Sequence, residues 1–344
     1  MNKVSFIYLS QEDVKKSGGM DMAQTISDIE DVLVMRHNGE CVVPHKVVLR
    51  KGTQAEESVS GRINALPGYL GGDTNIGGIK WVASFVRNPF EHGLPRSISL
   101  ITINSFETGV PLAIMDGTII SAMRTGAVAG VACKYLANVD ARTVGVVGAG
   151  VIGRTVLMAV NAVQKQLAHI EIYDLSMERA EKFAEEMQGE LGVPVSAADS
   201  AEKALSGKDI LVTATPAKEP YVKTQWVTKG SLYLHISGYE CDYGVVSQSD
   251  KIVVDNWEDV KARNSQTPAL MFHDAMLSDN DIHAEIAEII TGQKPGRETR
   301  EERIFFNPVG MGVQDLIVAN RIYETAKEEG YGKTLTLWDD PAWV

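Results

Sequence analysis

The sequence predicts an α/β protein that contains a doubly wound parallel sheet and a second, α+β domain. Three observations carry this prediction. Strand-like and helix-like segments alternate between residues 143 and 257, as parallel βαβ units require. Most segments before residue 118 are strand-like and separated by short turns, which favours a mixed or antiparallel sheet. The stretch GAGVIG at 148–153 lies between a predicted strand and a predicted helix, where a dinucleotide-binding turn is found.

The N-terminal third is expected to form the α+β domain. Short apolar runs bounded by Gly and Pro indicate strands. These runs are 4–10, 43–50, 61–70, 77–85 and the two arms of a hairpin within 97–117. Helices are expected at 21–38 and 121–137. Ser10, which precedes Glu12 and Asp13, marks a further helix start.

The middle of the chain is expected to form the parallel sheet. The expected strands are 143–147, 169–174, 209–216, 231–238 and 251–257, and the expected helices are 151–164, 176–191 and 201–207. Crossovers between parallel strands are right-handed. With the glycine-rich turn after its first strand, this order predicts a Rossmann-type sheet.

Composition excludes several classes of function. The 344 residues carry a net charge of −12 and show no cluster of Lys and Arg, so we expect no nucleic-acid partner. No apolar run resembles a signal peptide or a membrane span. Cys41, Cys133 and Cys241 lie far apart and lack metal-ligand spacing, which suits a reducing cytoplasm. We therefore expect a cytoplasmic protein without a metal, whose partners are small molecules or other protein chains.

The glycine-rich turn predicts a site for NAD. Gly148 allows the tight turn, Gly150 lets the backbone approach a pyrophosphate, and Gly153 permits close packing of helix and strand. The helix N-terminus offers N–H groups and a positive dipole end to the phosphates. Asp174 ends the next predicted strand, where a carboxylate binds ribose hydroxyls and repels a 2′-phosphate. These features favour NAD(H) over NADP(H), and over a tight turn without a ligand.

A second predicted strand end belongs to the same site. The residues TATP at 213–216 follow an apolar strand. In open α/β sheets, ligands bind at the carboxyl edge of the strands. We therefore expect this segment to lie beside the cofactor.

Two basic residues outside the nucleotide motif are candidates for chemistry. Lys80 lies in the apolar run GGIKWVASF, between Ile79 and Trp81; the alternative is an outward-facing residue of an alternating strand. Arg124 lies near the start of a helix rich in small residues. Arginine forms a two-pronged hydrogen-bond donor for carboxylates, and the alternative is a charge on the helix surface. Pattern alone leaves both alternatives open.

Acidic candidates follow a later strand of the parallel sheet. Glu240 in HISGYECDYG comes after the strand that is expected to end near the nicotinamide, where an acid can take or give a proton. Asp242 is its rival for that role. His235 is interpreted as an ordinary strand histidine, and Cys133 and Cys241 as structural residues without a His partner.

Four stretches together carry a resemblance to a known family. They are GGIKWV, SAMRTGAVAG, VVGAGVIG with YD after the next strand, and NPVGMGVQD at 307–315. In this order they resemble the ornithine cyclodeaminase/mu-crystallin family through residues 40–330. The resemblance implies a homodimer. A substrate-binding and dimerisation domain of 1–125 plus 318–344 would accompany an NAD-binding domain of 126–317.

The resemblance also implies roles for individual residues. Arg50, Lys80 and Arg124 match the family's substrate-carboxylate and reaction-centre residues, and Arg62 is grouped with the substrate-binding residues. Glu240 falls where cyclodeaminases carry a catalytic aspartate, although the family's GGDCPGK reads GYECDYG here. This departure puts ornithine cyclisation in doubt. The implied cofactor contacts are Thr125, Gly148, Gly150, Val151, Ile152, Gly153, Asp174, Thr215, Pro216, Ser237, Gly310 and Met311.

The implied activity is NAD-dependent oxidation at the C–N bond of an amino acid or secondary amine. The chain is also similar to a dehydrogenase branch that serves siderophore biosynthesis, in the stretches KVVLR, GRINALPGYLGG, GIKWVAS, KIVVDNW, IHAEIAEIITGQKPGRE and TLTLW. That branch cleaves N-(2-amino-2-carboxyethyl)-L-glutamate to 2,3-diaminopropionate and 2-oxoglutarate. The alternatives are a redox-neutral ornithine-type cyclodeaminase, an opine or alanine dehydrogenase-like activity, and a non-catalytic binder.

Overall fold

The computed structural model describes residues 3–52 and 61–343. The chain divides into two compact units, the first formed by Met1–Arg124 with Met311–Val344 and the second by Thr125–Gly310. Helix α5 (Thr118–Leu136) contains the first boundary between them. Each unit is built around its own sheet, as the sequence predicts.

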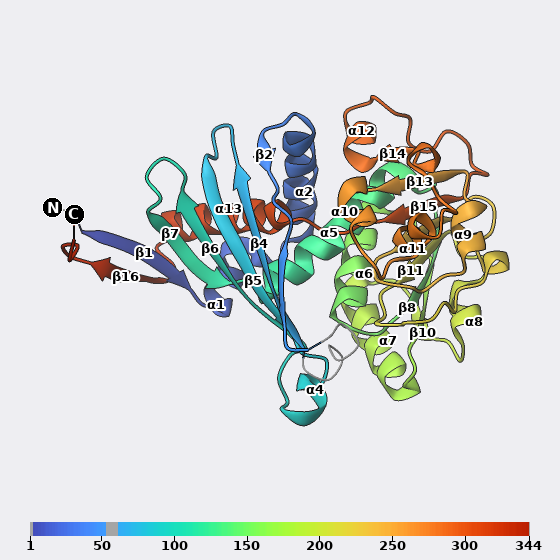
Figure 1. Cartoon of the computed structure of the whole chain (residues 1–344). Helices are drawn as coiled ribbons and strands as arrows, with labels where there is room; N and C mark the ends of the chain where they lie inside the picture. The colour runs from blue at the N-terminus through green and yellow to red at the C-terminus, as the bar shows by residue number, and fades with distance from the viewer. Residues whose placement is uncertain (1–2, 53–60, 344) are drawn as a thin grey trace. The chain divides into compact units, whose positions relative to one another are not determined.

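The first unit contains a mixed sheet with strand order β16-β1-β7-β6-β5-β4-β2, in which β3 also pairs with β4. Its strands are β1 (Val4–Leu9), β2 (Cys41–Val42), β3 (Val47–Arg50), β4 (Arg62–Leu70), β5 (Ile76–Ser84), β6 (Ser97–Ser105), β7 (Pro111–Asp116) and β16 (Lys333–Trp338). The terminal strands β1 and β16 pair antiparallel, so the two chain ends lie together (Figure 1). The expected hairpin and the expected N-terminal strands are confirmed.

Helices cover one face of this sheet. They are α1 (Gln11–Val14), α2 (Met22–His37) and α13 (Gly312–Glu329), with a π-helical turn at Lys15–Gly19, whereas the short helix α4 (Asn88–Glu91) lies in the connection between β5 and β6. Ser10 caps α1 through a capping box with Asp13, as the sequence indicates. Helices α2 and α13 pack against each other, and α13 also contacts β4, β5 and β6.

The helix α13 corrects one domain boundary. Residues 311–317, which the family resemblance assigns to the second domain, belong to the first unit in the structure. The physical reason is that α13 runs without a break from Gly312 and starts directly against β4. A Cβ atom added at Gly312 would lie 2.8 Å from the carbonyl oxygen of Leu66.

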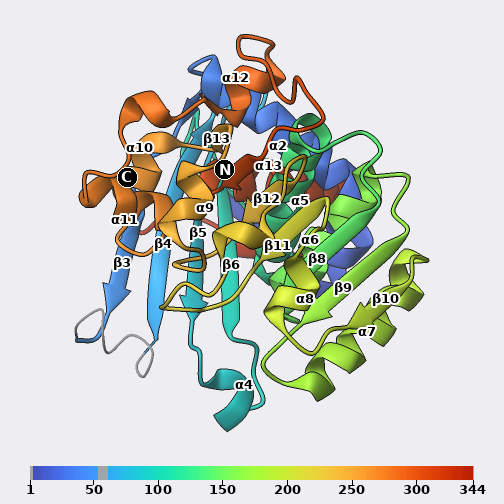
Figure 2. The same cartoon turned by 90° about the vertical axis from the view of Figure 1, so that its right-hand side faces the viewer.

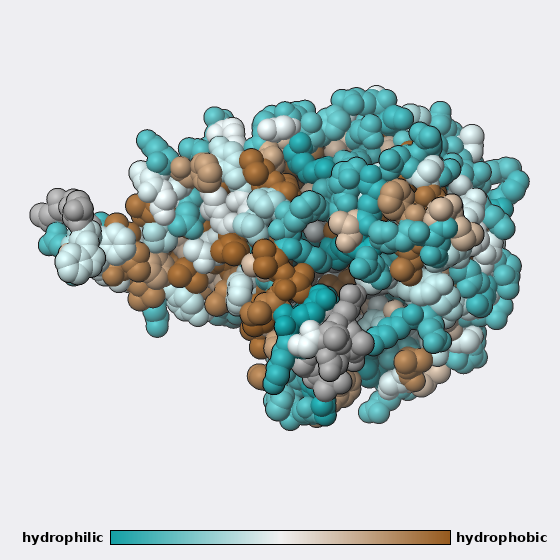
Figure 3. Space-filling view, in the orientation of Figure 1, coloured by the Kyte–Doolittle hydropathy of each residue, from teal (hydrophilic) through white to brown (hydrophobic). Residues whose placement is uncertain are grey.

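The opposite face of the first sheet is apolar and exposed. Alternation of side chains along a strand puts i and i+2 on one face. The outward positions on β3, β5 and β6 hold Val47, Leu49, Trp81, Ile98 and Leu100, each at least 43% exposed. Apolar side chains gather over the strands of this sheet in Figure 3. Contiguous apolar surface of this kind marks an interaction site.

The second unit contains a sheet whose described strand pairs are all parallel, in the order β10-β9-β8-β11-β12-β15-β13-β14. Its strands are β8 (Thr143–Val147), β9 (His169–Tyr173), β10 (Val195–Ala197), β11 (Ile210–Thr213), β12 (Leu232–His235), β13 (Lys251–Val254), β14 (Ala284–Glu285) and β15 (Ile304–Asn307). The order reverses between β8 and β11, which defines the topological switch point of a doubly wound sheet. The predicted α/β fold class is confirmed.

Helices connect these strands. They are α6 (Val151–Val163), α7 (Met177–Leu191), α8 (Ala201–Leu205), α9 (Tyr243–Ser247), α10 (Trp257–Lys261), α11 (Thr267–His273) and α12 (Ile286–Ile290), with 3-10 turns at Thr224–Trp226 and Asp279–Asp281. Figure 2 shows α7 alongside β9 and β10. The central strands β8, β11, β12, β13 and β15 are buried on both faces, which explains their mostly continuous apolar sequences.

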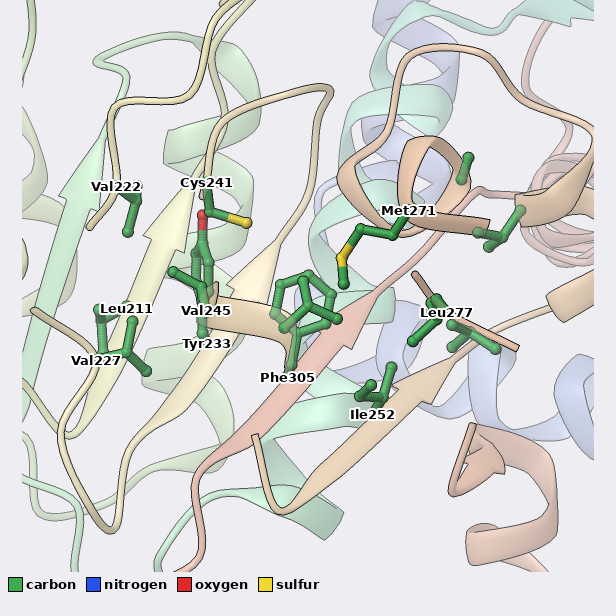
Figure 4. Packing of buried hydrophobic residues seen from close by; sticks show 14 of the residues in the cluster. Leu211, Val222, Val227, Tyr233, Cys241, Val245, Ile252, Met271, Leu277 and Phe305 are labelled. Atoms are coloured by element: carbon green, nitrogen blue, oxygen red, sulfur yellow. The ribbon is translucent and has the colours of Figure 1, made fainter. Parts of the chain in front are cut away.

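A hydrophobic cluster fills one side of the second sheet (Figure 4). Tyr233 on β12 and Phe305 on β15 stack edge to face with ring centroids 5.4 Å apart, a favourable aromatic geometry. Cys241 is buried in the same cluster. The cluster therefore supports the strand ends that follow β11 and β12.

None of the helices in the described ranges has the length and apolarity needed to cross a membrane.

Candidate functional site

The glycine-rich turn joins β8 to α6 at the switch point of the second sheet. Gly148 has a φ of +112°, a conformation that side chains disfavour. A Cβ atom at Gly153 would lie 2.3 Å from the carbonyl oxygen of Gly148, so only glycine allows the helix to approach the turn. By contrast, a Cβ atom at Gly150 would meet nothing within 4 Å. The open space at Gly150 is room for a ligand.

The first turn of α6 points into this space. Gly150 is the N-cap of the helix and provides no side-chain cap. Val151 and Ile152 begin the helix, and the Val151 side chain is exposed. Helix N-termini with free N–H groups bind phosphate because the helix dipole adds to the hydrogen bonds. Val151, Ile152 and the three glycines therefore lie where the sequence analysis expects cofactor contacts.

Asp174 follows β9 and lies against the same turn. Its Oδ2 accepts a 3.0 Å hydrogen bond from the backbone N–H of Ala149, and its Oδ1 accepts one from Ser176 N–H at 3.1 Å. Arg179 Nη2 donates to Oδ2 at 3.1 Å. A carboxylate held beside the glycine-rich turn is placed to bind ribose hydroxyl groups.

The segment after β11 is held by Glu240. Glu240 Oε1 accepts hydrogen bonds from Thr215 N–H (2.7 Å), Thr215 Oγ1 (2.6 Å) and the Tyr221 hydroxyl (3.3 Å). Its Oε2 accepts one from Thr213 Oγ1 at 2.8 Å. The side chain is fully buried. Thr215 and Pro216 thus lie at the carboxyl edge of the sheet, as expected, and Glu240 determines where they lie.

This arrangement bears on the expected acid/base role of Glu240. Each carboxylate oxygen has about two lone-pair positions; three donors already meet at Oε1, and one reaches Oε2. Burial and the Glu240 carboxylate together raise the pKa of the Tyr221 hydroxyl, so this phenol remains a donor. The geometry favours a positioning role for Glu240 over proton exchange with a substrate, although an acid/base role stays a prediction.

Asp242, the rival acid, does not share this burial. Its side chain is 35% exposed and pairs with Lys223 at 3.3 Å. His235 is fully buried, and its Nδ1 lies 2.8 Å from Asn307 Oδ1. Burial lowers the pKa of His235. It is the ordinary strand histidine that its sequence context indicates.

The turn after β15 is held by a second buried carboxylate. Asp255 accepts hydrogen bonds from the backbone N–H groups of Val309 and Gly310, both at 2.8 Å. Gly310 has a φ of +78°. Gln266 Nε2 donates to the carbonyl oxygens of Ser237 (3.2 Å) and Pro308 (3.1 Å). Ser237 and Gly310 therefore lie on loops that share one hydrogen-bond network.

In the first unit, Lys80 is the buried centre of a charged cluster. Its side chain is 2% exposed, and its Nζ lies 2.6 Å from Oδ2 of Asp315, which is fully buried. Nζ also donates to Ser121 Oγ on α5 at 3.3 Å. The alternative of an outward-facing Lys80 is wrong, because the strand register turns Trp81 outward instead.

Arg124 joins the same cluster. Its Nε lies 3.2 Å from Asp315 Oδ1, and its Nη1 donates to Gln314 Oε1 at 3.2 Å. The arginine side chain is 12% exposed, so it is not a solvated helix-surface charge. Two cations share one buried carboxylate here, which leaves an excess of positive charge in the cluster.

The environment changes the acidity of Lys80. Burial and, after it, the nearby Arg124 charge lower the pKa of Lys80 to about 8, although Asp315 opposes both effects. A buried lysine of this kind exchanges protons near neutral pH, as general acids and bases must.

Arg50 and Arg62 lie on the same face of the sheet as Lys80. They are direct partners in the β3–β4 ladder, and Arg62 is opposite Ser84, which is four residues from Lys80 on β5. Like charges directly opposite one another destabilise a sheet. The pair places two guanidinium groups side by side on the face that carries Lys80.

Asp315 is the main residue that the sequence analysis missed, although it lies inside the quoted stretch NPVGMGVQD. Gln314 was missed with it. The sequence did contain a sign of a buried polar site, because Gln314 and Asp315 stand among apolar residues at the start of a helix. Polar side chains in such a position are buried only when they have hydrogen-bond or ionic partners. Nothing in the local pattern connects that pair to Lys80. No group of three or more potential metal ligands occurs within residues 3–52 and 61–343.

Comparison with known proteins places the chain. The model of the ornithine cyclodeaminase/mu-crystallin family matches residues 6–330. The chain belongs to this family. A curated relative, N-((2S)-2-amino-2-carboxyethyl)-L-glutamate dehydrogenase of Staphylococcus aureus, is 31% identical over 98% of this chain and 100% of its own length. The resemblance read from the sequence is confirmed.

Solved structures of ornithine cyclodeaminase/mu-crystallin relatives share the whole fold. The Δ1-pyrroline-2-carboxylate reductase of Thermococcus litoralis, in complex with NADH and L-proline, is 36% identical, with a TM-score of 0.87 and coverage of 95% of this chain and 99% of that one. An archaeal alanine dehydrogenase dimer with bound NAD is 32% identical, with a TM-score of 0.88 and coverage of 97% and 100%.

Two further residues implied by the ornithine cyclodeaminase/mu-crystallin resemblance lie at the boundaries between the units. Thr125 begins the second unit directly after Arg124. Met311 is 2% exposed, and its N–H donates to Gln314 Oε1 at 3.1 Å. Their expected contact with the cofactor stays a prediction.

Proposed function

We propose that this protein is an NAD-dependent oxidoreductase that acts on the C–N bond of an amino acid or secondary amine. The observation that carries the proposal is the buried Lys80–Asp315–Arg124 cluster, in a chain that also has a complete dinucleotide turn. The solved relatives that contain NADH or NAD support the cofactor assignment. The glycine-rich turn, the first turn of α6 and Asp174 would hold NAD.

The cluster suits a substrate carboxylate. Arg124 and Lys80, when Lys80 is protonated, carry two positive charges against the single negative charge of Asp315. A buried site of excess positive charge is completed by an anion. Arg124 offers the two-pronged geometry that carboxylates prefer. We assign Arg124 to the α-carboxylate of the substrate and Lys80 to the reacting nitrogen.

When bound, NAD⁺ accepts a hydride from the α-carbon of the substrate. The amine N–H proton must leave as the C=N bond forms, and Lys80 in its neutral form is the group that accepts it. Water then adds to the imine carbon, and the C–N bond breaks to release an amine and an oxo acid. Lys80 returns its proton to the departing nitrogen. Arg124 keeps the carboxylate fixed throughout, so the reacting bond stays oriented.

The finer substrate assignment is N-(2-amino-2-carboxyethyl)-L-glutamate, which would yield 2,3-diaminopropionate for siderophore biosynthesis and 2-oxoglutarate. The S. aureus relative of that name supports it. So does the face of the first sheet that carries Arg50 and Arg62 as well as Lys80, because this substrate has three carboxylates. Alanine, with one carboxylate, makes no use of additional arginines.

NADH absorbance tests the proposal. Purified protein is mixed with NAD⁺ and, in separate cuvettes, with the glutamate conjugate, L-alanine, L-proline and L-ornithine. Stoichiometric NADH from the conjugate supports both the reaction and its substrate. If NADH forms only with alanine or proline, the proposed reaction is supported and the proposed substrate is wrong. Ammonia from ornithine without net NADH identifies a redox-neutral lyase and contradicts the proposal.

We also propose that the protein is a homodimer. The exposed apolar face of β3, β5 and β6 supports this proposal, because a monomer rarely exposes contiguous apolar surface without a partner. The dimeric state of the archaeal alanine dehydrogenase also supports it.

A further inference from the structure

Asp315 is the shared counter-ion of Lys80 and Arg124. Its Oδ2 is 2.6 Å from Lys80 Nζ, and its Oδ1 is 3.2 Å from Arg124 Nε. The Asp315 carboxylate thus binds both side chains that are proposed to act on the substrate, each through one oxygen. The inference drawn from this geometry rests on the proposed function for its kinetic consequences.

We propose that Asp315 is a positioning residue that fixes the separation of Lys80 and Arg124 and regulates the charge on Lys80. It contacts neither substrate nor cofactor in this proposal. Its two oxygens keep Lys80 Nζ, the proton acceptor, at a fixed distance from the Arg124 guanidinium, which binds the substrate carboxylate. Its negative charge keeps the lysine from losing its proton too readily between turnovers.

Close packing of α13 on the sheet brings Asp315 to Lys80. Gly68 on β4 and Gly78 on β5 are direct partners in the ladder. A Cβ atom at Gly78 would lie 2.7 Å from Leu316 Cδ2, and one at Gly68 would lie 2.9 Å from Val313 Cγ1. The paired glycines therefore form a flat area on which the first turns of α13 rest. This contact places Asp315 with the rigidity that a positioning role needs.

The charges around Lys80 come from three directions. Arg124 on α5 opposes the ammonium charge, and Asp315 on α13 favours it. Arg62 and Arg50 lie on the same sheet face, further along β4 and β3, and no other carboxylate among the described residues affects the pKa of Lys80 as Asp315 does. Removal of the Asp315 charge therefore lowers the pKa of Lys80 below its value of about 8, because burial and Arg124, which both disfavour the charged lysine, then act without an opposing carboxylate.

Two substitutions separate position from charge. Asp315→Asn keeps the size of the side chain and removes its charge, whereas Asp315→Glu keeps the charge and displaces it by one methylene. In Asp315→Asn, we expect the acidic limb of the kcat/KM profile to move down by about one pH unit or more. In Asp315→Glu, we expect kcat to fall by about 100-fold, with the limb near its original pH and KM for NAD⁺ unchanged.

Asp28→Asn is the matched control. Asp28 is also a buried carboxylate bound to an arginine of α13, with its Oδ2 2.7 Å from Arg321 Nε. Its loss destabilises the unit without touching the cluster, so we expect a lower melting temperature and an unchanged pH profile. If Asp315→Asn behaves like Asp28→Asn, Asp315 is only structural and the proposal is wrong.

A measurement without turnover distinguishes this proposal from the proposed function. The ¹³Cε resonance of Lys80 in ¹³C-lysine protein, assigned by its absence in Lys80→Met, is titrated without NAD. We expect its midpoint to fall in Asp315→Asn and to stay in Asp28→Asn. An unchanged midpoint in Asp315→Asn overturns the proposal. A shifted midpoint in a protein that oxidises no amino acid retains this inference and rejects the proposed function.

Discussion

The carboxylate of Asp174 accepts a 3.0 Å hydrogen bond from the backbone N–H of Ala149, in the middle of the glycine-rich turn. The strand end that is predicted to select the cofactor is therefore joined directly to the turn that is predicted to bind its phosphates. This bond connects two consecutive strands of the sheet, β8 and β9. The two parts of the candidate cofactor site, the glycine-rich turn and Asp174, are thus joined by a hydrogen bond.

Asp174→Ala tests the cofactor preference. Loss of the ribose-binding carboxylate is expected to raise KM for NAD⁺ about 10- to 100-fold, since hydrogen bonds to charged groups contribute ~1.5–3 kcal/mol. Activity with NADP⁺ should rise, because the charge that repels its 2′-phosphate is gone. Initial rates with both cofactors measure the change, and Asp199→Ala, an exposed acid after β10, is the control. An unchanged preference would mean that Asp174 does not contact the ribose.

Lys80→Met tests the reacting lysine. We expect kcat to fall by at least about 1,000-fold, because both proton transfer and charge at the reacting nitrogen are lost. NADH binding, followed by fluorescence titration, should be unchanged, since Lys80 belongs to the first unit and the glycine-rich turn to the second. The exposed Lys16→Met serves as the control. Normal turnover by Lys80→Met would reduce Lys80 to a packing role.

The pH profile should show the titration of Lys80. Burial lowers the pKa of Lys80 to about 8, and the neutral form accepts the amine proton. The neutral fraction grows as pH rises, so kcat/KM should increase about tenfold per unit below pH 8 and level off above it. Rates measured from pH 6 to 10 with saturating NAD⁺ show whether kcat/KM rises with pH in this way. A profile that falls through pH 8 would show that protonated Lys80 is the active form.

Glu240→Gln distinguishes positioning from acid/base catalysis. Its carboxylate accepts four hydrogen bonds in a buried setting, and an amide cannot accept all four because its NH₂ group is a donor. We expect a loss of stability of about 1–3 kcal/mol and weaker NADH binding, measured by denaturant unfolding and fluorescence titration. Glu285→Gln is the control, because Glu285 also accepts a backbone N–H bond in the second unit. If Glu240→Gln kept normal stability but one limb of the pH profile of kcat/KM disappeared, Glu240 would instead have an acid/base role.

The proposed dimer depends on the exposed face of the first sheet. Trp81→Glu and Leu100→Glu place charges on directly paired outward positions of β5 and β6. We expect these variants to be monomers by analytical ultracentrifugation, because a charge buried in an apolar interface is costly. Phe90→Glu, an exposed aromatic residue on α4, is the control. A wild-type monomer, or a dimer that persists in both variants, would reject this interface.

The sequence by itself determined the periodic part of the fold. Alternating patterns located the strands and helices around the glycine-rich turn, because side-chain periodicity is a local property of the backbone. The same local reasoning placed Gly148 and Asp174 directly after strands and Gly153 in the first turn of the following helix, where the structure has them. It also identified Lys80 as unusual, since a charge within an apolar run needs a partner.

The tertiary structure alone decided which partner that is. Lys80 and Asp315 are separated by 235 residues, and their contact depends on α13 resting on the paired Gly68 and Gly78. Strand β16 likewise finds β1 from the opposite end of the chain. Local patterns state that a buried charge must be neutralised, but only long-range packing selects the residue that neutralises it. For that reason the sequence singled out Lys80 as a candidate, and only the folded chain identified Asp315 as the carboxylate that pairs with it.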